Sequence, residues 1–303
     1  MSDIRDWPLV ETHWLAGQLN DPALRIVDAR WRGEGGSDTL YQAGHIPGAI
    51  HLDWHQDLSQ TIDGVTDILL GPEAFARVMG EAGIGDDTFV VAYADTDHSG
   101  AARLWWALRA YGHEQVAILN GGITRWQAEG RPLESRSTMP APQTFTPRFQ
   151  PGWLATADEI ARSLAEPHNN VRLVDTRPLE QYQGRAVWTP LGSLFLPPGR
   201  NWTHVDGRPM RGGRIPGARH LHSVENLDPN DDYIYLPANK LRARAEAAGL
   251  DPGQRVITYC GVGISGSLGL FALYLAGFRN LALYDASWSE WGTDPSKPIE
   301  TDR

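Results

Sequence analysis

The sequence predicts an α/β protein made of two tandem copies of one domain, each a mostly parallel sheet covered by helices. Short apolar runs alternate along the chain with helical patterns, which is typical of β-α-β units with parallel strands. In addition, segments of the first half recur in the same order in the second half, as expected of a duplicated domain. A chain of 303 residues also has a length that is natural for two domains.

The internal repeat consists of pairs of similar segments in a preserved order. The pairs are Leu24–Arg30 with Val171–Arg177, Gly44–Ala49 with Gly213–Ala218, Phe89–Ala94 with Arg255–Cys260, and Tyr111–Trp126 with Ala276–Trp291. Between the two halves, the chain carries several prolines and little apolar periodicity, which indicates an extended linker. We therefore predict one domain over residues 1–134, a linker over 135–152 and a second domain over 153–303.

Local signals place strands and helices within each half. In the first half, the apolar run that ends at Ala94 predicts a strand, and it is followed by a helical pattern over Ala101–Tyr111 and by another strand over Val116–Leu119. In the second half, Thr156 stands before an acidic first turn and the apolar Ile160, which predicts a capped helix start. Each half therefore has the local pattern that a helix-covered parallel sheet requires.

Cys260 is the only cysteine, and it lies between a predicted buried strand and a glycine-rich loop. After the loop, the apolar stretch Leu268–Ala276 predicts a helix that ends at Gly277. Loop N–H groups and a helix N-terminus stabilise a thiolate, which is the reactive form of cysteine. The alternative is a small buried apolar residue. The loop glycines favour a reactive cysteine, and Ala94 at the equivalent position leaves the first domain without a nucleophile.

Composition and charge exclude several classes of function. The net charge of −10 argues against a nucleic-acid partner, and no apolar run approaches the length of a membrane span. One cysteine allows no intrachain disulfide, so cysteine usage implies no oxidising compartment. The segment Met1–Trp7 carries acidic residues and lacks the apolar core of a secretory signal, so a cytoplasmic location is expected.

These features together resemble the two-domain sulfurtransferases of the rhodanese family, and the resemblance covers nearly the whole chain. The most specific matching segments are Cys260–Ser265, Tyr284–Gly292, Gly44–Ala49 and Ala101–Trp106. The resemblance implies that Cys260 takes a sulfane sulfur from a small donor, becomes a persulfide and passes the sulfur to a thiophilic acceptor. The acceptor would be cyanide or a thiol, including the thiol of a thioredoxin-like protein. The covalent persulfide is the intermediate, and no separate cofactor is implied.

The loop after Cys260 bears on the choice of donor. In this family, members that prefer thiosulfate have Arg and Lys after the cysteine, and members that prefer 3-mercaptopyruvate have Cys-Gly-Ser-Gly-Val-Thr. The sequence matches the second pattern or keeps its chemistry at Gly261, Gly263, Ile264 and Ser265. It departs from that pattern at Val262, which lacks the hydroxyl thought to help protonate pyruvate.

A loop without cations argues against thiosulfate, because a dianion needs opposite charge nearby. The sequence thus predicts a 3-mercaptopyruvate sulfurtransferase, with thiosulfate as the alternative donor. A non-catalytic persulfide carrier or regulatory binding module is an alternative of another class. A cysteine phosphatase is disfavoured, because it needs an arginine where Ser265–Ser267 stand.

Arginines are the expected ligands of the donor's carboxylate, because a guanidinium binds a carboxylate through two parallel hydrogen bonds. Gln181 stands where the family places one such arginine, so Arg185 is the candidate there, and Arg208 and Arg211 are candidates for the second. The chain from Arg185 to Gly213 forms a long loop that we expect to shape the entrance to the cleft. Arg177 has a counterpart in the first half, which favours a structural role in pairing a carboxylate.

The remaining candidates are Ser265 and His45, together with the loop glycines. The Ser265 hydroxyl has two compatible roles, donating a hydrogen bond to the sulfur and capping the following helix. Gly261 and Gly263 are expected to permit positive φ and close approach of N–H groups to the sulfur. His45 matches a family histidine that faces the cysteine across the domain interface, where it would relay a proton, and the alternative is a turn histidine bonded to backbone.

Overall fold

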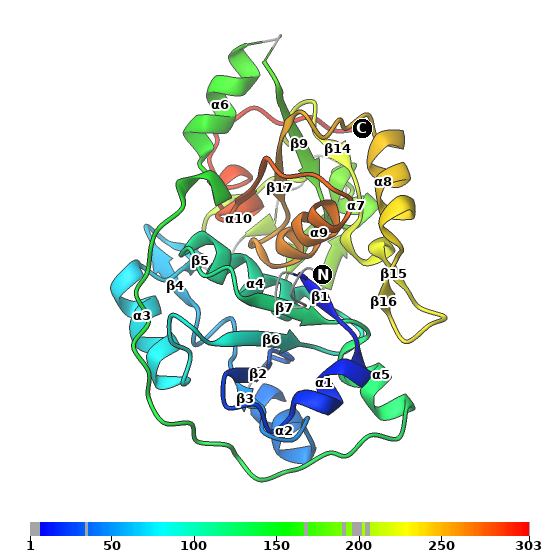
Figure 1. Cartoon of the computed structure of the whole chain (residues 1–303). Coiled ribbons are helices and arrows are strands. Elements are labelled where there is room, and N and C mark those ends of the chain that lie inside the picture. The colour runs from blue at the N-terminus through cyan, green and yellow to red at the C-terminus, as the bar shows by residue number, and fades with distance from the viewer. Residues whose placement is uncertain are drawn as a thin grey trace. The chain divides into compact units, whose positions relative to one another are not determined.

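The computed structural model of the chain describes residues 7–33, 36–166, 169–189, 192–195, 202–203 and 207–302. The chain forms two compact units, which Figure 1 shows as a ribbon. The first comprises Met1–Gln60, Leu69–Gln150 and Leu227–Leu236, and the second comprises Thr61–Ile68, Pro151–Asn226 and Pro237–Arg303. Residues 1–6, on which the expectation of no secretory signal rests, lie outside the described part of the chain.

The first unit is built on a five-stranded sheet whose paired strands are all parallel. In spatial order the strands are β1 (Leu9–Val10), β7 (Val116–Leu119), β6 (Phe89–Tyr93), β2 (Leu24–Asp28) and β3 (Ile50–His51). Its helices are α1 (Thr12–Gln18), α2 (Gly36–Ala43), α3 (Pro72–Glu81), α4 (Ser99–Ala110) and α5 (Gly122–Ala128). The strand β6 therefore lies in the middle of the sheet, followed by α4 as the sequence predicts.

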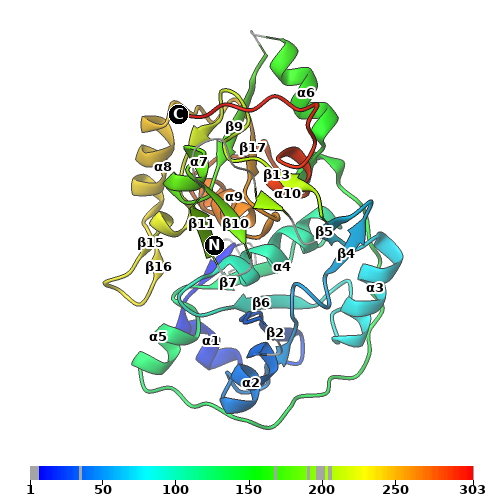
Figure 2. The ribbon, with the colours of Figure 1, turned by 180° about the vertical axis from the view of Figure 1, so that it is seen from behind.

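The second unit repeats this sheet strand for strand. Starting from the edge strand that corresponds to β1, its spatial order is β8 (Leu154–Ala155), β18 (Leu281–Tyr284), β17 (Arg255–Tyr259), β9 (Val171–Asp175) and β14 (Arg219–His220). All paired strands are parallel. Its helices are α6 (Ala157–Ala165), α7 (Leu179–Tyr182), α8 (Ala238–Ala247), α9 (Ile264–Leu275) and α10 (Ser287–Trp291), seen from behind in Figure 2. Two parallel sheets with the same strand order confirm the predicted α/β fold and the duplication.

Two hairpins cross the simple division of the chain into halves. The hairpin β4 (Ser59–Ile62) to β5 (Val65–Leu69) lies mostly in the second unit, and β15 (Leu227–Asp228) to β16 (Ile234–Tyr235) lies in the first. In the first unit, the Tyr235 N–H donates to the side-chain oxygen of Asn120 at 2.9 Å. Each unit thus includes a short arm from the other half of the sequence, which the sequence did not predict.

The segment predicted as a linker is extended but not free. From residue 137 to 150 it has no helix or strand, yet it is bonded to the first unit along its length. Gln143 and Gly80 are joined by a backbone hydrogen bond of 3.0 Å, and the Arg148 N–H donates to the Tyr111 carbonyl at 2.8 Å. Phe145 is buried there against Phe75. Proline has no backbone N–H, so the prolines of this segment disfavour a helix or a paired strand. The backbone groups named above instead form hydrogen bonds with the rest of the first unit.

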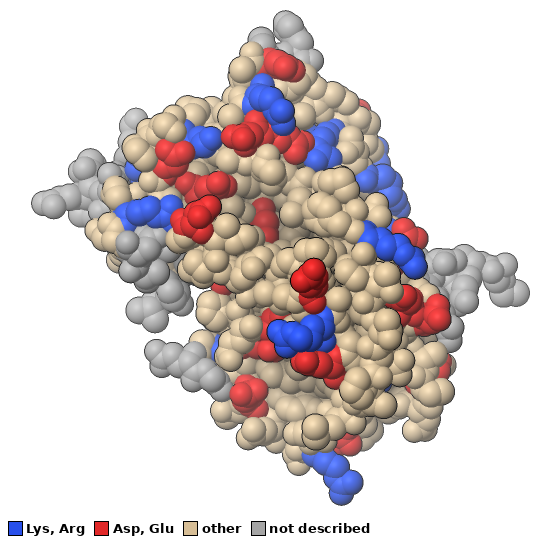
Figure 3. All heavy atoms as spheres, turned by 90° about the vertical axis from the view of Figure 1, so that its left-hand side faces the viewer, with Lys and Arg blue, Asp and Glu red and all other residues tan. Residues whose placement is uncertain are grey.

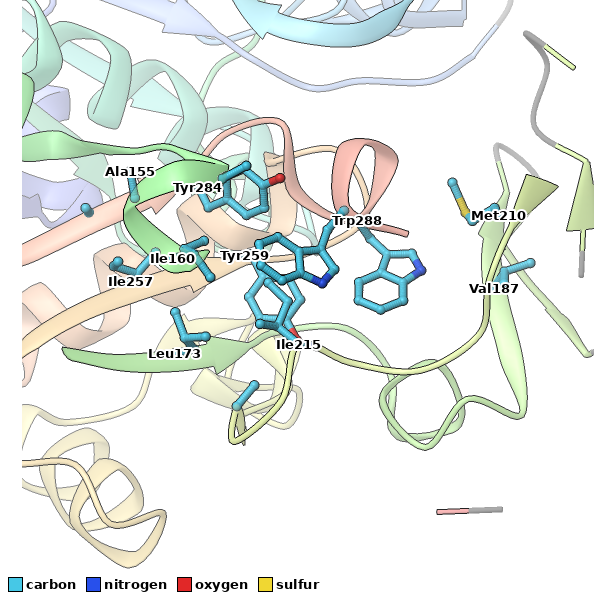
Figure 4. Close-up of a cluster of buried hydrophobic side chains, with 14 residues drawn as sticks. Ala155, Ile160, Leu173, Val187, Met210, Ile215, Ile257, Tyr259, Tyr284 and Trp288 are labelled. Atoms are coloured by element: carbon cyan, nitrogen blue, oxygen red, sulfur yellow. The ribbon is translucent and has the colours of Figure 1, made fainter. Parts of the chain in front are cut away.

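Local residues set where the helices α6 and α9 of the second unit begin. The Thr156 hydroxyl accepts a hydrogen bond from the Glu159 N–H at 3.1 Å, which confirms the predicted cap of α6. Helix α9 begins at Ile264, several residues before the apolar stretch that predicted it, because Gly263 at φ +82° ends the loop. Tyr259, Tyr284 and Trp288 lie in a buried cluster that joins the sheet to α10, as Figure 4 shows.

Candidate active site around Cys260

Cys260 directly follows β17, the middle strand of the second sheet, and is only 2% exposed. On β17, Tyr259 pairs in register with Asp175 of β9. In parallel α/β sheets, ligands bind just beyond the carboxyl ends of the strands. The thiol is therefore placed where such folds carry their chemistry.

Glycine at position 263 shapes the loop between Cys260 and α9. Gly263 has φ +82°, a left-handed conformation that L side chains rarely adopt, and its carbonyl accepts from both the N–H and the hydroxyl of Ser267. Gly261 does not have positive φ, so that part of the expectation was wrong. The backbone can turn at Gly263 alone and then enter the helix.

The start of α10 holds the first two peptide groups of the loop. The Trp288 N–H donates to the Cys260 carbonyl at 3.0 Å, and the Ser289 N–H donates to the Gly261 carbonyl at 2.9 Å. The Ser289 hydroxyl donates to the same Gly261 carbonyl at 3.0 Å. In the other direction, the Cys260 N–H donates to the Ser287 hydroxyl oxygen at 3.1 Å. Consecutive residues thus fix the backbone on either side of the sulfur.

Val262, Ile264 and Ser265 complete the loop and the first turn of α9. The first two are buried, at 4% and 7% exposure, so the loop has an apolar side. Ser265 is half-buried and is the second residue of the helix. The helix cap is Gly263, so the proposed capping role of Ser265 was wrong, and its role toward the sulfur stays a prediction.

Arg177 forms a buried ion pair with Asp175 next to this loop. The guanidinium lies 4.4 Å from the centre of the Trp288 ring, and its Nη2 also donates to the Gly213 carbonyl at 2.6 Å. Burial lowers the pKa of Arg177, but Asp175, Tyr259 and Cys260 outweigh that effect and hold the pKa above its ordinary value. Arg30 and Asp28 form the same pair in the first unit, which favours the structural role.

His45 in the first unit and Arg214 in the second unit occupy equivalent positions and make similar contacts. The His45 ring stacks on Tyr41 at 3.8 Å, and its Nδ1 lies 2.8 Å from the Tyr41 carbonyl. The Arg214 guanidinium likewise lies 4.3 Å from the Tyr182 ring centre. Each residue forms a backbone bridge with a glutamate, His45 with Glu134 and Arg214 with Glu300. This recurrence favours a structural role for His45, and a proton relay stays a prediction.

The three candidate arginines have different surroundings. Arg211 donates to the backbone carbonyls of Trp291, Gly292, Asp294 and Lys297, at distances between 2.5 and 3.1 Å. Arg208 donates to the Gly64 carbonyl at 3.0 Å, and Arg185 is exposed and bonds the Gln183 side chain. Arg211 is thus the least available for a carboxylate. Parts of the long loop from 185 to 213, namely 190–191, 196–201 and 204–206, lie outside the described residues.

Comparison with known proteins decides the family. Two stretches, residues 11–129 and 156–294, match the rhodanese-like domain. The chain belongs to the rhodanese family of sulfurtransferases. The chain is 34% identical over 302 residues to a thiosulfate sulfurtransferase of Corynebacterium glutamicum, covering 97% of this chain and 90% of the relative. The duplicated parallel sheet is therefore that of two tandem rhodanese-like domains.

Two further matches are a sulfur carrier protein and a 3-mercaptopyruvate sulfotransferase. The chain is 31% identical over 294 residues to the sulfur carrier protein TtuD of Thermus thermophilus, covering 96% of this chain and 95% of the relative. The crystal structure of a 3-mercaptopyruvate sulfotransferase of Escherichia coli, SseA, aligns with a TM-score of 0.77 at 28% identity, covering 93% of this chain and 99% of that one. The sulfurtransferase relatives imply a small-molecule sulfur donor and acceptor.

The outer surface of the protein carries charges of both signs. On the face drawn in Figure 3, acidic and basic side chains lie close to one another rather than in separate areas. Among the described residues, none of the helices is long and apolar enough to cross a membrane.

Ser287 is a side-chain contact of the cysteine that sequence reasoning missed. It lies 27 residues from Cys260, in the segment that the family resemblance singled out as a block. The usable signal was the repeat itself, because aligning the two halves places Ser287 opposite Gly122. A serine opposite a glycine, in the half that carries Cys260, marks a side chain that the fold alone does not require.

Proposed function

We propose that this protein transfers the sulfur of 3-mercaptopyruvate to cyanide or a thiol, through a persulfide on Cys260 in which it is the sulfane sulfur. The observation that carries the proposal is the placement of Cys260: a buried thiol after the middle strand, at the head of a tight loop with no lysine or arginine among residues 261–266. The family is established by the comparisons, whereas the donor, the acceptor and the role of Cys260 are the proposed parts.

The proposed reaction has two steps that balance. The Cys260 thiolate attacks the sulfur of 3-mercaptopyruvate, the carbon–sulfur bond breaks, and the pyruvate enolate leaves. The enolate takes up the proton that the donor thiol carried, which leaves pyruvate and an ionised persulfide. Cyanide or a thiolate then attacks the outer sulfur, the sulfur–sulfur bond breaks, and the Cys260 thiolate is restored.

Charge supports a monocarboxylate donor. Thiosulfate carries two negative charges and would gain from cations in the loop, which this sequence lacks. A single carboxylate needs one or two arginines, and Arg185 and Arg208 remain candidates for that contact. Arg211 is less suited, because its guanidinium donors already serve backbone carbonyls.

Thiosulfate is the second candidate donor, and Val262 is the observation that favours it. The family's mercaptopyruvate pattern has a serine at this position, whose hydroxyl is thought to help protonate the leaving enolate. Val262 is buried and has no proton to give. A sulfur carrier that turns over only with a protein acceptor is the alternative from another class, and the TtuD relationship supports considering it.

Steady-state rates with each donor, using cyanide as the acceptor, test the choice of donor. We expect the higher catalytic efficiency with 3-mercaptopyruvate at equal pH and salt. The intact mass should rise by one sulfur after treatment with the donor, and Cys260→Ser should remove both the mass increase and the activity. A higher efficiency with thiosulfate would overturn the donor assignment, and a Cys260→Ser enzyme with normal turnover would overturn the mechanism.

A further inference from the structure

Ser287 has a backbone conformation that serine rarely adopts. It is fully buried and has φ +51°, in the left-handed region that disfavours residues with a Cβ atom. Such conformations persist only where the surrounding structure imposes them, and they gather at functional sites. The Ser287 side chain is therefore expected to have a role that a glycine could not fill.

The first unit contains the same backbone with a glycine in this place. Gly122 begins α5 with φ +54°, as Ser287 begins α10 with φ +51°. The next residue in each unit makes the same hydrogen bond: Ile123 N–H to the Ala94 carbonyl at 2.9 Å, and Trp288 N–H to the Cys260 carbonyl at 3.0 Å. Glycine is therefore sufficient for this turn where the strand is followed by Ala94.

The Ser287 hydroxyl connects the turn to the cysteine. Its oxygen accepts from the Cys260 N–H at 3.1 Å, and its proton goes to the Tyr284 carbonyl at 2.8 Å. Cys260 lies beyond the last residue of β17, so its N–H is outside the sheet ladder. A buried N–H without an acceptor is costly, and a hydroxyl bonded on both sides has a fixed direction.

We propose that Ser287 is a positioning residue for Cys260. Ser287 fixes the peptide group before Cys260 through the Cys260 N–H, while Trp288 fixes the peptide group after it through the Cys260 carbonyl. Together these bonds set the direction of the Cα–Cβ bond that carries the sulfur. This inference rests on the proposed role of Cys260 in sulfur transfer. Because Ser287 acts on the cysteine rather than on the donor, its loss should lower kcat and leave KM nearly unchanged.

The test compares Ser287→Gly with Ser287→Ala. Both variants remove the hydroxyl, but glycine tolerates positive φ and alanine does not. We expect kcat to fall about tenfold or more in both, as for a lost buried hydrogen bond that orients the nucleophile, with KM changed by less than about threefold. Alkylation of Cys260 by iodoacetamide, which needs no sulfur donor, should slow by a similar factor.

Ser289→Ala is the matched control. Ser289 is also a buried serine of α10 whose hydroxyl bonds the loop, but the Gly261 carbonyl keeps the Ser289 N–H bond of 2.9 Å after the substitution. We therefore expect a much smaller loss of kcat in Ser289→Ala. Thermal unfolding followed by circular dichroism checks that each variant is folded.

Several outcomes would overturn the inference. If Ser287→Gly keeps full kcat while Ser287→Ala loses it, the backbone conformation matters and the hydroxyl does not. Equal losses of kcat in Ser287→Gly and Ser289→Ala would show that any hydrogen bond to the loop has this effect. A Ser287→Gly variant that fails to fold would show that Ser287 stabilises the domain rather than positioning Cys260. If Cys260→Ser keeps sulfur transfer, the proposed function fails, and the alkylation rates still decide the role of Ser287.

Discussion

Arg177 and Asp175 form a buried ion pair through two parallel hydrogen bonds, Nε to Oδ1 at 2.9 Å and Nη2 to Oδ2 at 2.6 Å. Arg30 and Asp28 form the same pair in the first unit, with corresponding distances of 2.9 and 2.5 Å. A charge this deeply buried is tolerated only with its partner. The pair links two neighbouring parts of each unit, because the arginine also donates to the carbonyl of Gly213 or Gly44.

Replacing Arg177 with Met should strongly destabilise the protein. The substitution leaves the Asp175 carboxylate buried without a countercharge, which costs about 3–5 kcal/mol. Urea unfolding measures the loss. Arg77→Met is the control, because Arg77 pairs with Glu81 on the surface, and exposed pairs contribute about 0–1 kcal/mol. Equal losses in the two variants would contradict a structural role for the buried pair.

The stability of the protein should depend on pH through His98. Burial lowers the pKa of this histidine from 6.5 to about 4 in the folded protein. The unfolded chain takes up the proton near pH 6.5, whereas the folded protein stays neutral until about pH 4, so stability falls as pH falls through this window. Between pH 7 and pH 5 we expect a loss of about 2 kcal/mol from this group.

Urea unfolding at both pH values, for the parent and for His98→Gln, isolates the His98 contribution. Other titrating groups are common to the two proteins and cancel in the comparison. The parent should lose about 2 kcal/mol more than the variant on going from pH 7 to pH 5. The same loss in both proteins would show that His98 takes up its proton without opposing folding.

Arg185 and Arg211 should respond differently to substitution. If Arg185 binds the donor carboxylate, Arg185→Ala should reduce the catalytic efficiency with 3-mercaptopyruvate about ten- to hundredfold, mainly through KM, with unfolding unchanged. Arg211→Lys should instead lower stability by about 1–3 kcal/mol, because an ammonium cannot serve the four carbonyls that the guanidinium bonds. A normal KM in Arg185→Ala would shift the assignment to Arg208.

Adding a hydroxyl at position 262 should raise turnover with 3-mercaptopyruvate. Val262→Ser restores the group that the family's mercaptopyruvate pattern places there, and a positioned proton donor speeds release of the enolate. We expect kcat with 3-mercaptopyruvate to rise about two- to tenfold and the thiosulfate rate to stay level. Val262→Ala, which is smaller but has no hydroxyl, controls for the change in volume. A rise in the alanine variant as well would assign the effect to space in the loop.

The sequence by itself determined the features that depend on short stretches of chain. Alternating strands and helices, the repeat, the capping of α6 by Thr156 and the loop that begins at Cys260 were all predictable, because periodicity, capping and turn chemistry act over a few residues. That the two sheets share one strand order follows from the same repeat, since a duplicated pattern folds twice into the same topology, whereas the order itself came from the structure.

Only the tertiary structure decided which polar groups meet. Arg211 was a candidate ligand in the sequence, but in the fold its guanidinium is occupied by carbonyls around α10. The placement of the hairpin β15–β16 in the first unit was likewise not predictable from the sequence. The contact between Cys260 and Ser287 joins residues far apart in the chain and depends on how β17 and α10 pack. Such pairings are set by long-range packing of whole elements, and no local pattern of residue types encodes them.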